Sequence, residues 1–500
     1  MRKIEIRGNS SRPYREVLMP EYETVIGLEV HVQVKTESKL FCSCPNLYGA
    51  EPNTLVCPVC MGFPGVLPSV NREAVRKTVL SGIMCGCEIA SYSKFDRKSY
   101  FYPDMPKNYQ ISQFDLPLCS GGKVFISGKG FSGTPLAGRH IGITRIHLEE
   151  DVGKSIHFSG FSGIDFNRAG VPLMEIVSEP DMRSADEAYA YLTALKEVMQ
   201  YGGTSECDME KGQMRCDVNV SLRVRGQKEF GTKIEIKNLN SFRAVHRSLV
   251  FEMERQEKIL ASGGKLSQET RAWNDDDGYT FLLRSKESSH DYRYFPDPDL
   301  MPMEFIPQEI EEFRKEIPEL PQLKRKRFVE QFSLAEYDAE VLTADRALAD
   351  YFEKGAVNSG QPKILANWII TELLRELGAR NLTVPENPVP IESIVELVKL
   401  ISDGTISGKI AKDVFLDIFE TNKTPLQIVK EKGLVQISDD SAIEKLVTKV
   451  IEDNPEQLAQ YKSGKTAVFQ FFIGQVMKLS RGKANPATAN RILKEKIEKL

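Results

Sequence analysis

Three segments in the first half of the chain alternate between apolar and polar residues, and this alternation constrains the fold more than any other feature. In TVIGLEVHVQV (residues 24–34), alternate positions from Ile26 to Val34 are apolar, whereas Glu29, His31 and Gln33 share the other face. The segments RCDVNVSL (215–222) and TKIEIKNL (232–239) repeat the pattern. Period-two alternation is typical of an antiparallel sheet with one buried face, so we expect such a sheet here.

The polar face of this predicted sheet has an unusual composition. It carries Glu29, His31, Gln33, Arg215, Asp217, Asn219, Ser221, Lys233, Glu235 and Lys237. Asp and Asn are poor strand formers, and choices that break local propensity tend to mark functional sites. The pattern favours a functional concave face, although a sheet with one face simply in water remains an alternative.

Length and periodicity predict several domains of α+β type. A chain of 500 residues is too long for one core, and helical periodicity replaces the strand pattern beyond Pro298. A proline-dotted linker near residue 298 and a second break near residue 407 divide the rest. We expect an N-terminal extension (1–20), a catalytic sheet domain (21–297), an all-helical domain (298–407) and a helical tail (408–500).

Composition limits the possible cellular compartments of the protein and its possible binding partners. The chain is 41% hydrophobic and 27% charged with a net charge of −4, so nucleic acid would require a local basic patch. We find no apolar run long enough for a membrane span and no secretory signal in the first twenty residues. Nine cysteines without a signal indicate a reducing compartment, and we expect a cytoplasmic protein.

Four of the cysteines are spaced like metal ligands. Cys42 and Cys44 form C-x-C, and after twelve residues Cys57 and Cys60 form C-x-x-C. A redox pair would begin a helix, but the sequence after Cys60 (MGFPGVLP) does not read as a helix start. Two short knuckles joined by a loop suit a tetrahedral Cys₄ zinc site, with free thiols as the alternative. Four thiolates fill the coordination sphere, so the predicted site is structural.

Carboxylates gather in two further segments. HLEEDVGKS contains Glu149, Glu150 and Asp151 in succession, and Glu175 lies inside the apolar run VPLMEIV. A buried carboxylate needs a partner or a metal, and Mg²⁺ prefers oxygen ligands that it shares with substrate phosphates. An acidic surface loop is the alternative for residues 149–151. We find no P-loop motif, so ATP would be held by metal and by residues of the polar sheet face. The residues predicted to bind the nucleotide are Arg215, Asp217, Asn219, Lys233 and Lys237.

Longer blocks carry a resemblance to a known family. YETVIGLEVHVQ, PGVLPSVN, KFDRKSYFYPDMPKNYQISQFD, HLEEDVGK, PLMEIVSEPD, MRCDVNVSLR, GTKIEIKNLNSF, YRYFPDPDL and GQVMKLSRGKANP occur in one order. From about residue 21 onward the chain resembles the GatB family, the B subunits of the glutamyl-/aspartyl-tRNA amidotransferases. The resemblance implies a cradle-like antiparallel-sheet domain followed by a helical domain and a YqeY-like tail.

The resemblance also implies an activity. Family members form an ATP-dependent carbon–nitrogen ligase with glutamine as amido donor, in which GatB phosphorylates the side-chain carboxyl of Glu-tRNA(Gln) or Asp-tRNA(Asn). A separate amidase chain, GatA, releases ammonia, which crosses a tunnel and displaces the phosphate. The implied partners are GatA, the small chain GatC, tRNA(Gln) or tRNA(Asn), and a misacylating synthetase as a further partner.

Matching motifs imply roles for individual residues. His31, Glu150 and Glu175 resemble the Mg²⁺ ligands, and Glu29 and Glu149 those of a second metal position; His31 could instead orient the substrate. Lys98 and Lys107 resemble polar residues of the ammonia channel, with Lys107 and Glu150 as a hypothetical gate. The four cysteines imply the zinc-containing version. The tail places basic residues for tRNA phosphates at Lys478, Arg481, Lys483, Arg491, Lys494 and Lys496.

Two other functions compete with this interpretation. A zinc-stabilised RNA-binding scaffold would present tRNA to a partner without chemistry of its own. A free-standing glutaminase is disfavoured, because we find no Gly-Ser-Ser amidase signature and no nucleophilic cysteine with a placed histidine.

Overall fold

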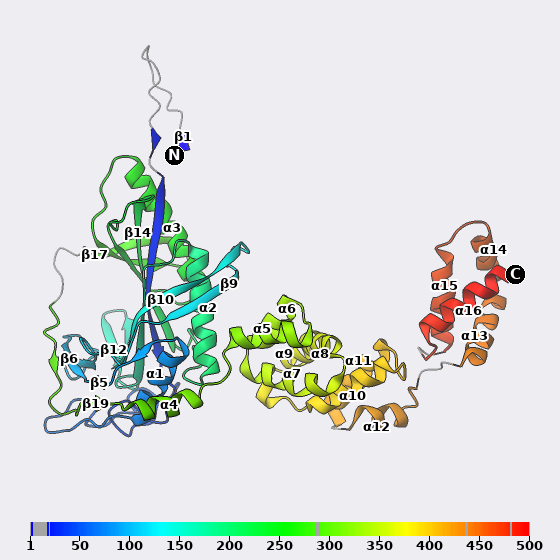
Figure 1. Cartoon of the computed structure of the whole chain (residues 1–500), viewed down its shortest axis with the longest axis horizontal. Helices are drawn as coiled ribbons and strands as arrows, with labels where there is room; N and C mark the ends of the chain where they lie inside the picture. Colours follow the sequence, from blue (N-terminus) through cyan, green and yellow to red (C-terminus); the bar gives the residue numbers. More distant parts are fainter. Residues whose placement is uncertain are drawn as a thin grey trace, which may run out of the picture. The chain divides into compact units, whose positions relative to one another are not determined.

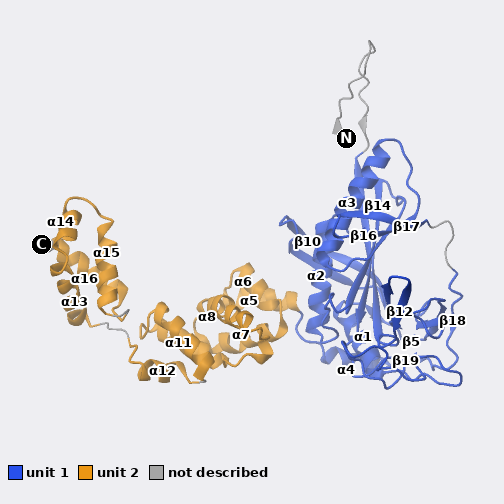
Figure 2. Cartoon of the chain, turned by 180° about the vertical axis from the view of Figure 1, so that it is seen from behind, with its two compact units in different colours: residues 1–320 blue, residues 321–500 orange. Residues whose placement is uncertain are grey.

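The structure is a computed structural model of the whole chain, and it consists of two compact units. It describes residues 2–3, 18–19, 21–285, 291–421, 423–435, 439–480 and 483–499. The first unit comprises Met1–Leu320 and the second Pro321–Leu500 (Figure 2). The large sheet and the clustered carboxylates belong to the first unit, and the second unit is helical.

A ten-stranded sheet forms the first unit (Figure 1). Its central strand is β3 (Tyr22–Gln33), which pairs antiparallel with β13 (Pro172–Ser178) on one side and with β14 (Met214–Val224) on the other. β13 is followed outward by β10 (Pro135–Glu150), and β14 by β15 (Ile234–Lys237). The three segments that alternate in the sequence therefore become neighbouring strands β3, β14 and β15, as predicted.

The order and the remaining strands of the sheet complete this picture. The order is β17-β16-β15-β14-β3-β13-β10-β8-β4, with β9 paired to β10. The pair β15–β16 is parallel, so the sheet is mixed rather than wholly antiparallel. The outer strands are β4 (Glu88–Ile89), β8 (Cys119–Ser120), β9 (Lys123–Lys129), β16 (Glu269–Asn274) and β17 (Tyr279–Ser285).

Two long helices of the first unit bury the apolar face of the sheet. α2 (Ala185–Tyr201) and α3 (Phe242–Ala261) share one core with Val30, Ile176 and Val218 of the central strands. Ser184 and Ser241 cap the two helices by accepting hydrogen bonds from backbone N–H groups of the first turn. Because both helices cover the apolar face, the opposite, polar face faces the shorter elements of the unit.

The shorter elements of the first unit lie around this sheet. α1 (Arg72–Met84) begins at Asn71, whose side chain accepts from Glu73 and Ala74 N–H. β6 (Asp96–Ser99) pairs with both β7 (Tyr109–Ser112) and β18 (Phe295–Pro296). The others are β1 (Arg2–Lys3), β2 (Leu18–Met19), β5 (Tyr92–Ser93), β11 (Lys154–Phe158), β12 (Phe161–Asp165), β19 (Met303–Glu304) and α4 (Pro307–Lys315).

The second unit contains two helical cores. One is built from residues between Phe328 and Val429 and the other from residues between Ile443 and Ile497. The helices are α5 (Pro321–Phe332), α6 (Glu336–Thr343), α7 (Arg346–Ser359), α8 (Pro362–Trp368), π-helical η1 (Ile369–Leu373), α9 (Leu374–Ala379), 3₁₀ η2 (Val384–Glu386), α10 (Ile391–Ser402), α11 (Gly408–Thr421), α12 (Pro425–Glu431), α13 (Asp440–Glu452), α14 (Pro455–Lys462), α15 (Val468–Leu479) and α16 (Pro486–Lys499).

The boundaries differ from those read from the sequence, for reasons of packing. The proline-dotted stretch after residue 298 packs on the first core through Leu300, Phe305 and Phe313, so it belongs to the first unit. Residues 408–429 bury Ile410 and Phe415 in the same core as α10, and Leu434 packs against it, so the break between the helical cores lies between Leu434 and Ile443 rather than at residue 407. Proline and glycine mark turns, but burial decides which side of a turn shares a core.

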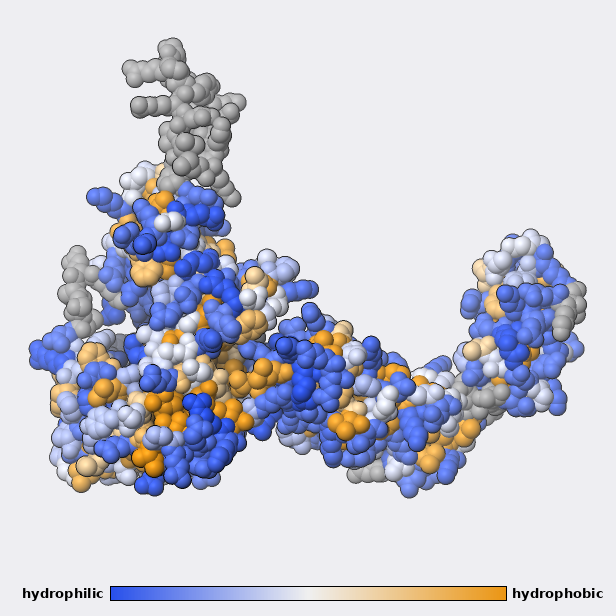
Figure 3. Space-filling view, in the orientation of Figure 1, coloured by the Kyte–Doolittle hydropathy of each residue, from blue (hydrophilic) through white to orange (hydrophobic). Residues whose placement is uncertain are grey.

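The face of the molecule that Figure 3 shows is largely hydrophilic, with apolar patches on both units. Within the part of the chain that the structure describes, no helix combines the length and apolar character needed to cross a bilayer.

Candidate functional site

Five ionisable side chains from three neighbouring strands meet on the polar face of the sheet. Glu175 on β13 lies opposite His147 of β10 on one side and opposite His31 of β3 on the other. Its Oε2 is 3.4 Å from His31 Nε2 and 3.6 Å from His147 Nε2. Glu29 and Glu149 complete the group, at 3.7 and 3.9 Å from His31 Nε2. We call these five residues the carboxylate cluster.

His31 compensates part of the charge of three closely spaced carboxylates. Burial alone would lower the pKa of His31, but a hydrogen bond with Glu175 and the charges of the three glutamates raise it to about 9. Burial also opposes ionisation of Glu175, yet His147 and His31 hold its pKa below the usual range. For Glu29, burial and repulsion by Glu175 raise the pKa. The cluster therefore combines carboxylates with at least one cationic side chain, that of His31.

The cluster can hold divalent metal ions. Two overlapping sets, Glu29–His31–Glu175 and His147–Glu149–Glu175, each offer ligand atoms that all lie within 4.8 Å of one another. Carboxylate oxygens suit Mg²⁺, and imidazole nitrogens extend the range to transition metals. The predicted residues Glu29, His31, Glu149 and Glu175 are thus brought together by the fold.

Glu150 does not join this cluster, in contrast to the ligand set implied by the resemblance. It follows Ile146 and Leu148 on the opposite face of β10, because neighbouring side chains of a strand alternate. Its Oε1 accepts from the Ile111 N–H at 2.8 Å and from the Lys107 ammonium. The Lys107–Glu150 pair predicted from the sequence is therefore present, but on the side away from Glu175.

His147 is the member that sequence reasoning missed. It is 4% exposed, and it takes the place in the cluster that had been assigned to Glu150. The signal was available, because His147, Glu149 and Asp151 alternate with Ile146, Leu148 and Glu150. Reading HLEED with period two would have placed His147 on the same face as Glu149.

Cations follow the same face next to the cluster. Arg215 lies opposite His31, and its Nη2 is 2.9 Å from Oδ1 of the buried Asp151. The charge of Asp151 raises the pKa of Arg215 although burial opposes it. Further along, the Lys237 ammonium pairs with Asp217, which lies opposite Glu29.

Two predicted nucleotide-binding residues lie farther from the carboxylate cluster. Asn219 of β14 lies opposite Gly27 and Glu235, two positions beyond Asp217 on the same face. Lys233 is exposed and precedes β15 by one residue. Both lie farther along the sheet from Glu175 than Arg215 does, since β14 runs from Arg215 past Asp217 to Asn219.

A cavity of about 810 Å³ adjoins the end of the polar face at Arg215. Its lining includes Gln33, Lys154, Arg168, Lys211 and Arg215. Five cations of the whole lining (Lys35, Lys154, Arg168, Lys211 and Arg215) face three acids (Asp165, Glu206 and Glu210), and this modest excess of positive charge suits an anionic ligand such as a phosphate. Its size is that of a small-molecule or nucleotide site.

Lys98 lies on the other side of the cluster. Burial would lower the pKa of Lys98, but Glu149 and Glu175 raise it, so the ammonium retains its charge close to both carboxylates. Its Nζ lies 4.9 Å from the ring centroid of Tyr292. Lys98 therefore neighbours the cluster, whereas Lys107 lies with Glu150 on the opposite face.

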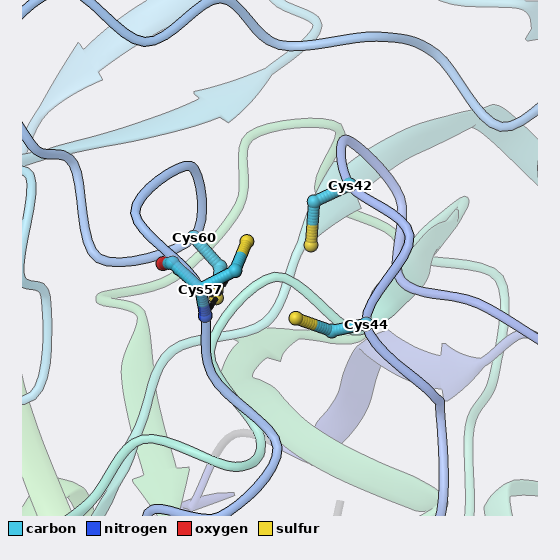
Figure 4. A group of neighbouring side chains, drawn as sticks. All are labelled: Cys42, Cys44, Cys57 and Cys60. Atoms are coloured by element: carbon cyan, nitrogen blue, oxygen red, sulfur yellow. Dashed lines mark hydrogen bonds between the residues drawn. The ribbon is translucent and has the colours of Figure 1, made fainter.

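The four cysteines predicted to bind zinc converge, as Figure 4 shows. The Sγ atoms of Cys42, Cys44, Cys57 and Cys60 all lie within 4.8 Å of one another. Four thiolates at this spacing fit a tetrahedral zinc ion. The buried Lys39 Nζ lies 3.8 Å from Cys60 Sγ and is placed to offset part of the negative charge of such a centre.

A small cavity links the cysteine cluster to the Lys107–Glu150 pair. It has a volume of about 190 Å³, and Cys42, Cys60, Lys107, Glu150 and Tyr109 are among its lining residues. The cysteine loops thus form one wall of the space next to the pair.

The basic residues predicted for the tail lie on α15, α16 and the segment between them. Lys478 and Lys494 are exposed, and Lys483 is half-buried. Arg491 pairs with Asp440 at 2.6 Å, and Lys496 with Glu444 at 2.9 Å, so part of their charge is neutralised. Arg481 lies outside the described residues.

Comparison with known proteins agrees with the site. The family described as the GatB/GatE catalytic domain matches residues 24–311, and a second, described as the GatB domain, matches residues 350–497. Proteins named as the B subunit of an aspartyl/glutamyl-tRNA(Asn/Gln) amidotransferase are similar over nearly the whole chain. That of Carboxydothermus hydrogenoformans is 52% identical, with 96% of this chain and 100% of the relative covered.

Two further relatives of the same name give the same result. The protein of Moorella thermoacetica is 51% identical, covering 95% of this chain and 100% of the relative. That of Persephonella marina is 52% identical, covering 96% of this chain and 100% of the relative. A sheet with clustered carboxylates, a helical region and these matches lead to one conclusion: the chain belongs to the GatB/GatE family of tRNA amidotransferase subunits.

Proposed function

We propose that this chain acts as the GatB component of a glutamine-dependent tRNA amidotransferase. Its substrates are Glu-tRNA(Gln), Asp-tRNA(Asn) or both, in line with the printed name of its relatives. The carboxylate cluster is the centre at which ATP activates the side-chain carboxyl of the misacylated tRNA. The convergence of three glutamates and two histidines on one sheet face is the observation that carries this proposal.

Divalent cations fit the cluster. Mg²⁺ would be held by the oxygens of Glu29, Glu149 and Glu175, and when bound it neutralises charge on phosphoryl oxygens. His31 and His147 lie against the carboxylates and hold them in position, and each offers a ligand nitrogen once that nitrogen has lost its proton. The identity and number of the metal ions belong to the proposal.

The chemistry that this face would support balances in two steps. An oxygen of the substrate carboxylate attacks the γ-phosphorus of ATP, the bond to the bridging oxygen breaks, and ADP leaves. The nitrogen of ammonia then attacks the carbonyl carbon of the acyl phosphate, a proton is lost and inorganic phosphate leaves. Arg215, fixed by Asp151, and Lys98 bring positive charge to opposite sides of the cluster, where they orient the anionic groups.

Ammonia would come from the amidase chain GatA of the same complex, in which the small chain GatC takes part. The cavity between the cysteine loops and the Lys107–Glu150 pair supports a route that ends near β10. Lys107 and Glu150 would serve as its gate. The tRNA substrate and the free thiols of the chain support the cytoplasm as its compartment.

One substitution distinguishes this function from an RNA-binding scaffold. In the assembled complex, Glu175→Gln should abolish ATP- and glutamine-dependent amidation of both misacylated tRNAs while tRNA binding persists. A scaffold would keep full amidation in this variant. Glu257→Gln, at an exposed position of α3, is the matched control and should behave like the unmodified complex.

A further inference from the structure

A stacked aromatic pair lies beside the carboxylate cluster and has no role in the function proposed above. The rings of Phe114 and Tyr294 are parallel within 9°, with centroids 4.2 Å apart. They come from distant parts of the chain, one just after β7 and the other just before β18. Phe114 is 57% exposed although its ring is stacked on one side.

Several contacts place this stack at the edge of the cluster. Two residues before Phe114, the Ser112 hydroxyl donates to Glu149 Oε2 at 3.0 Å. Tyr294 packs edge-to-face against Tyr292, whose ring in turn lies 4.9 Å from the Lys98 ammonium. The side chains from Glu149 to Tyr294 therefore form one continuous wall.

The backbone around both rings is held in place. The Phe114 N–H donates to Asp96 Oδ2 at 3.2 Å. On the other side, β18 pairs with β6, and the Ser99 N–H donates to the Tyr292 carbonyl at 2.9 Å. Arg97 Nε also binds the buried Asp297 at 2.8 Å. The stack is thus preorganised rather than a chance contact of two mobile side chains.

We propose that the open face of Phe114 binds a purine base of the substrates that react at the cluster. Tyr294 covers one face of the ring, so the opposite face can accept a third ring in the same stack. The base is an adenine, either that of ATP or that of the terminal adenosine of the tRNA. This inference rests on the proposed function, because both adenines must come near the reacting carboxyl.

The chemistry of the wall fits such a ligand. A nucleobase stacks on an aromatic ring without requiring hydrogen bonds, and the phosphate or ribose attached to it is polar. Lys98 contacts the Tyr292 ring and also interacts electrostatically with Glu149 and Glu175, so its ammonium is placed to meet an anionic group of the ligand. An adenosine on Phe114 would therefore have its apolar part against the stack and its polar part toward the cluster.

The test compares the Michaelis constants for both substrates in the assembled complex. Phe114→Leu keeps apolar volume but removes the ring, and it should raise one KM by about 5-fold to 140-fold, the range for loss of one stacked base. Phe114→Tyr keeps the ring and should restore the original value. Binding titrations with ATP and with a short RNA ending in CCA should show the same shift without turnover.

A second exposed aromatic pair provides the matched control. Phe158 and Phe161 on the β11–β12 hairpin stack with centroids 4.8 Å apart, and Phe161 is 65% exposed. Phe161→Leu should leave both KM values unchanged. If it raised them as Phe114→Leu does, loss of any exposed ring would account for the effect and the proposal would be overturned.

The possible outcomes distinguish binding of the adenine of ATP from binding of the terminal adenosine of the tRNA. A change confined to the KM for ATP assigns the stack to the nucleotide, and one confined to the KM for tRNA assigns it to the terminal adenosine. Unchanged values for both, or loss of co-purification with the partner chains, overturn the proposal. Failure of this inference can be distinguished from failure of the proposed function. The proposed function is tested by the amidation activity of Glu175→Gln, whereas this inference is tested by the KM values of Phe114→Leu.

Discussion

At the scale of single residues, alternation along β10 separates two functions that lie next to each other in the sequence. Glu149 enters the carboxylate cluster with Glu175, whereas Glu150 pairs with Lys107 on the opposite face. The same strand thus contributes both to the centre proposed for phosphorylation and to the proposed end of the ammonia route. Substitutions at neighbouring positions should therefore give different phenotypes.

Lys107→Met tests the pair. Lys107 and Glu150 are both almost fully buried, so removing the cation leaves an uncompensated carboxylate and should lower the free energy of unfolding by about 3–5 kcal/mol. Amidation should also uncouple, with more glutamine hydrolysed per amide formed. Denaturant unfolding and the ratio of the two products check this. The double variant with Glu150→Gln should recover most of the stability, and normal coupling in Lys107→Met would exclude a gate.

His147→Gln tests the histidine that the sequence analysis missed. Its Nε2 lies 3.6 Å from Glu175 and 3.8 Å from Glu149, so it contributes to one of the two candidate metal sets. We expect divalent cation affinity to fall by about 10-fold to 100-fold, as for loss of one supporting group. Calorimetric titration with Mg²⁺ and Mn²⁺ measures this directly. His157→Gln, at an exposed position of β11, should leave the affinity unchanged.

At the scale of elements, the cysteine loop and the turn that follows it form one side of the cavity next to the Lys107–Glu150 pair. Gly62 has φ +66°, and a Cβ built there would overlap Lys107 Cγ. Because Gly62 follows Cys60 by two residues, the geometry of the cysteine loop should fix the position of Lys107. The cysteine cluster would then support the proposed gate as well as the local fold.

Cys57→Ser should therefore affect more than the metal. Removing one of four thiolates should reduce bound zinc per chain and increase hydrogen exchange in residues 57–66 and around Lys107. Elemental analysis and exchange measured by mass spectrometry check the two effects. Cys207→Ser, at a buried cysteine outside the cluster, serves as the control for general loss of stability. Unchanged exchange at Lys107 in the zinc-depleted variant would contradict the coupling.

The start of α2 provides a prediction on pH dependence. Burial would raise the pKa of Asp186, but hydrogen bonds from Ser132 N–H and Oγ, at 2.9 and 2.6 Å, and the nearby His246 hold it below its usual value. A carboxyl with a lowered pKa stabilises the fold above its unfolded pKa of about 4 and loses this contribution as the pH falls through its folded value.

Asp186→Asn should thus lower the free energy of unfolding by about 1–2 kcal/mol at pH 7, because charged hydrogen bonds to Ser132 are lost. The difference from the unmodified chain should shrink as the pH falls below about 4, since the protonated aspartic acid no longer supplies it. Urea unfolding between pH 7 and pH 3 checks both statements. A difference that stays constant with pH would show that Asp186 acts without its charge.

The elements also show what sequence could and could not predict. The alternating segments predicted β3, β14 and β15 and the polar face, because period two is a local property. The strand order, the parallel β15–β16 pair and the wall of Phe114, Lys98 and Tyr294 depend on contacts between distant segments. His147 and Glu150 are an intermediate case. Alternation along the strand predicts their faces correctly, but the ligand set was taken from the matching motif instead, which assigned Glu150 to the cluster and left His147 out.

At the scale of the whole molecule, the carboxylate cluster and the basic residues predicted to bind tRNA belong to different units. The carboxylate cluster lies in the first unit, whereas the exposed lysines of α15 and α16 belong to the second. Phosphate contacts position a nucleic acid without reading its bases, so the tail would contribute affinity rather than catalysis. The domain matches have the same division, with the catalytic family ending at residue 311 and the second beginning at residue 350.

Lys478→Ala combined with Lys494→Ala tests this division. Each lysine that neutralises a phosphate releases counterions, so the double variant should bind tRNA more weakly and reduce the slope of log affinity against log salt by about 1.4–1.8. The KM for misacylated tRNA should rise while kcat is unchanged, because the cluster is untouched. Binding at several salt concentrations and steady-state kinetics measure these effects. Lys363→Ala, exposed on α8, is the control; an equal loss with it, or a fall in kcat from the double variant, would refute a separate binding role for the tail.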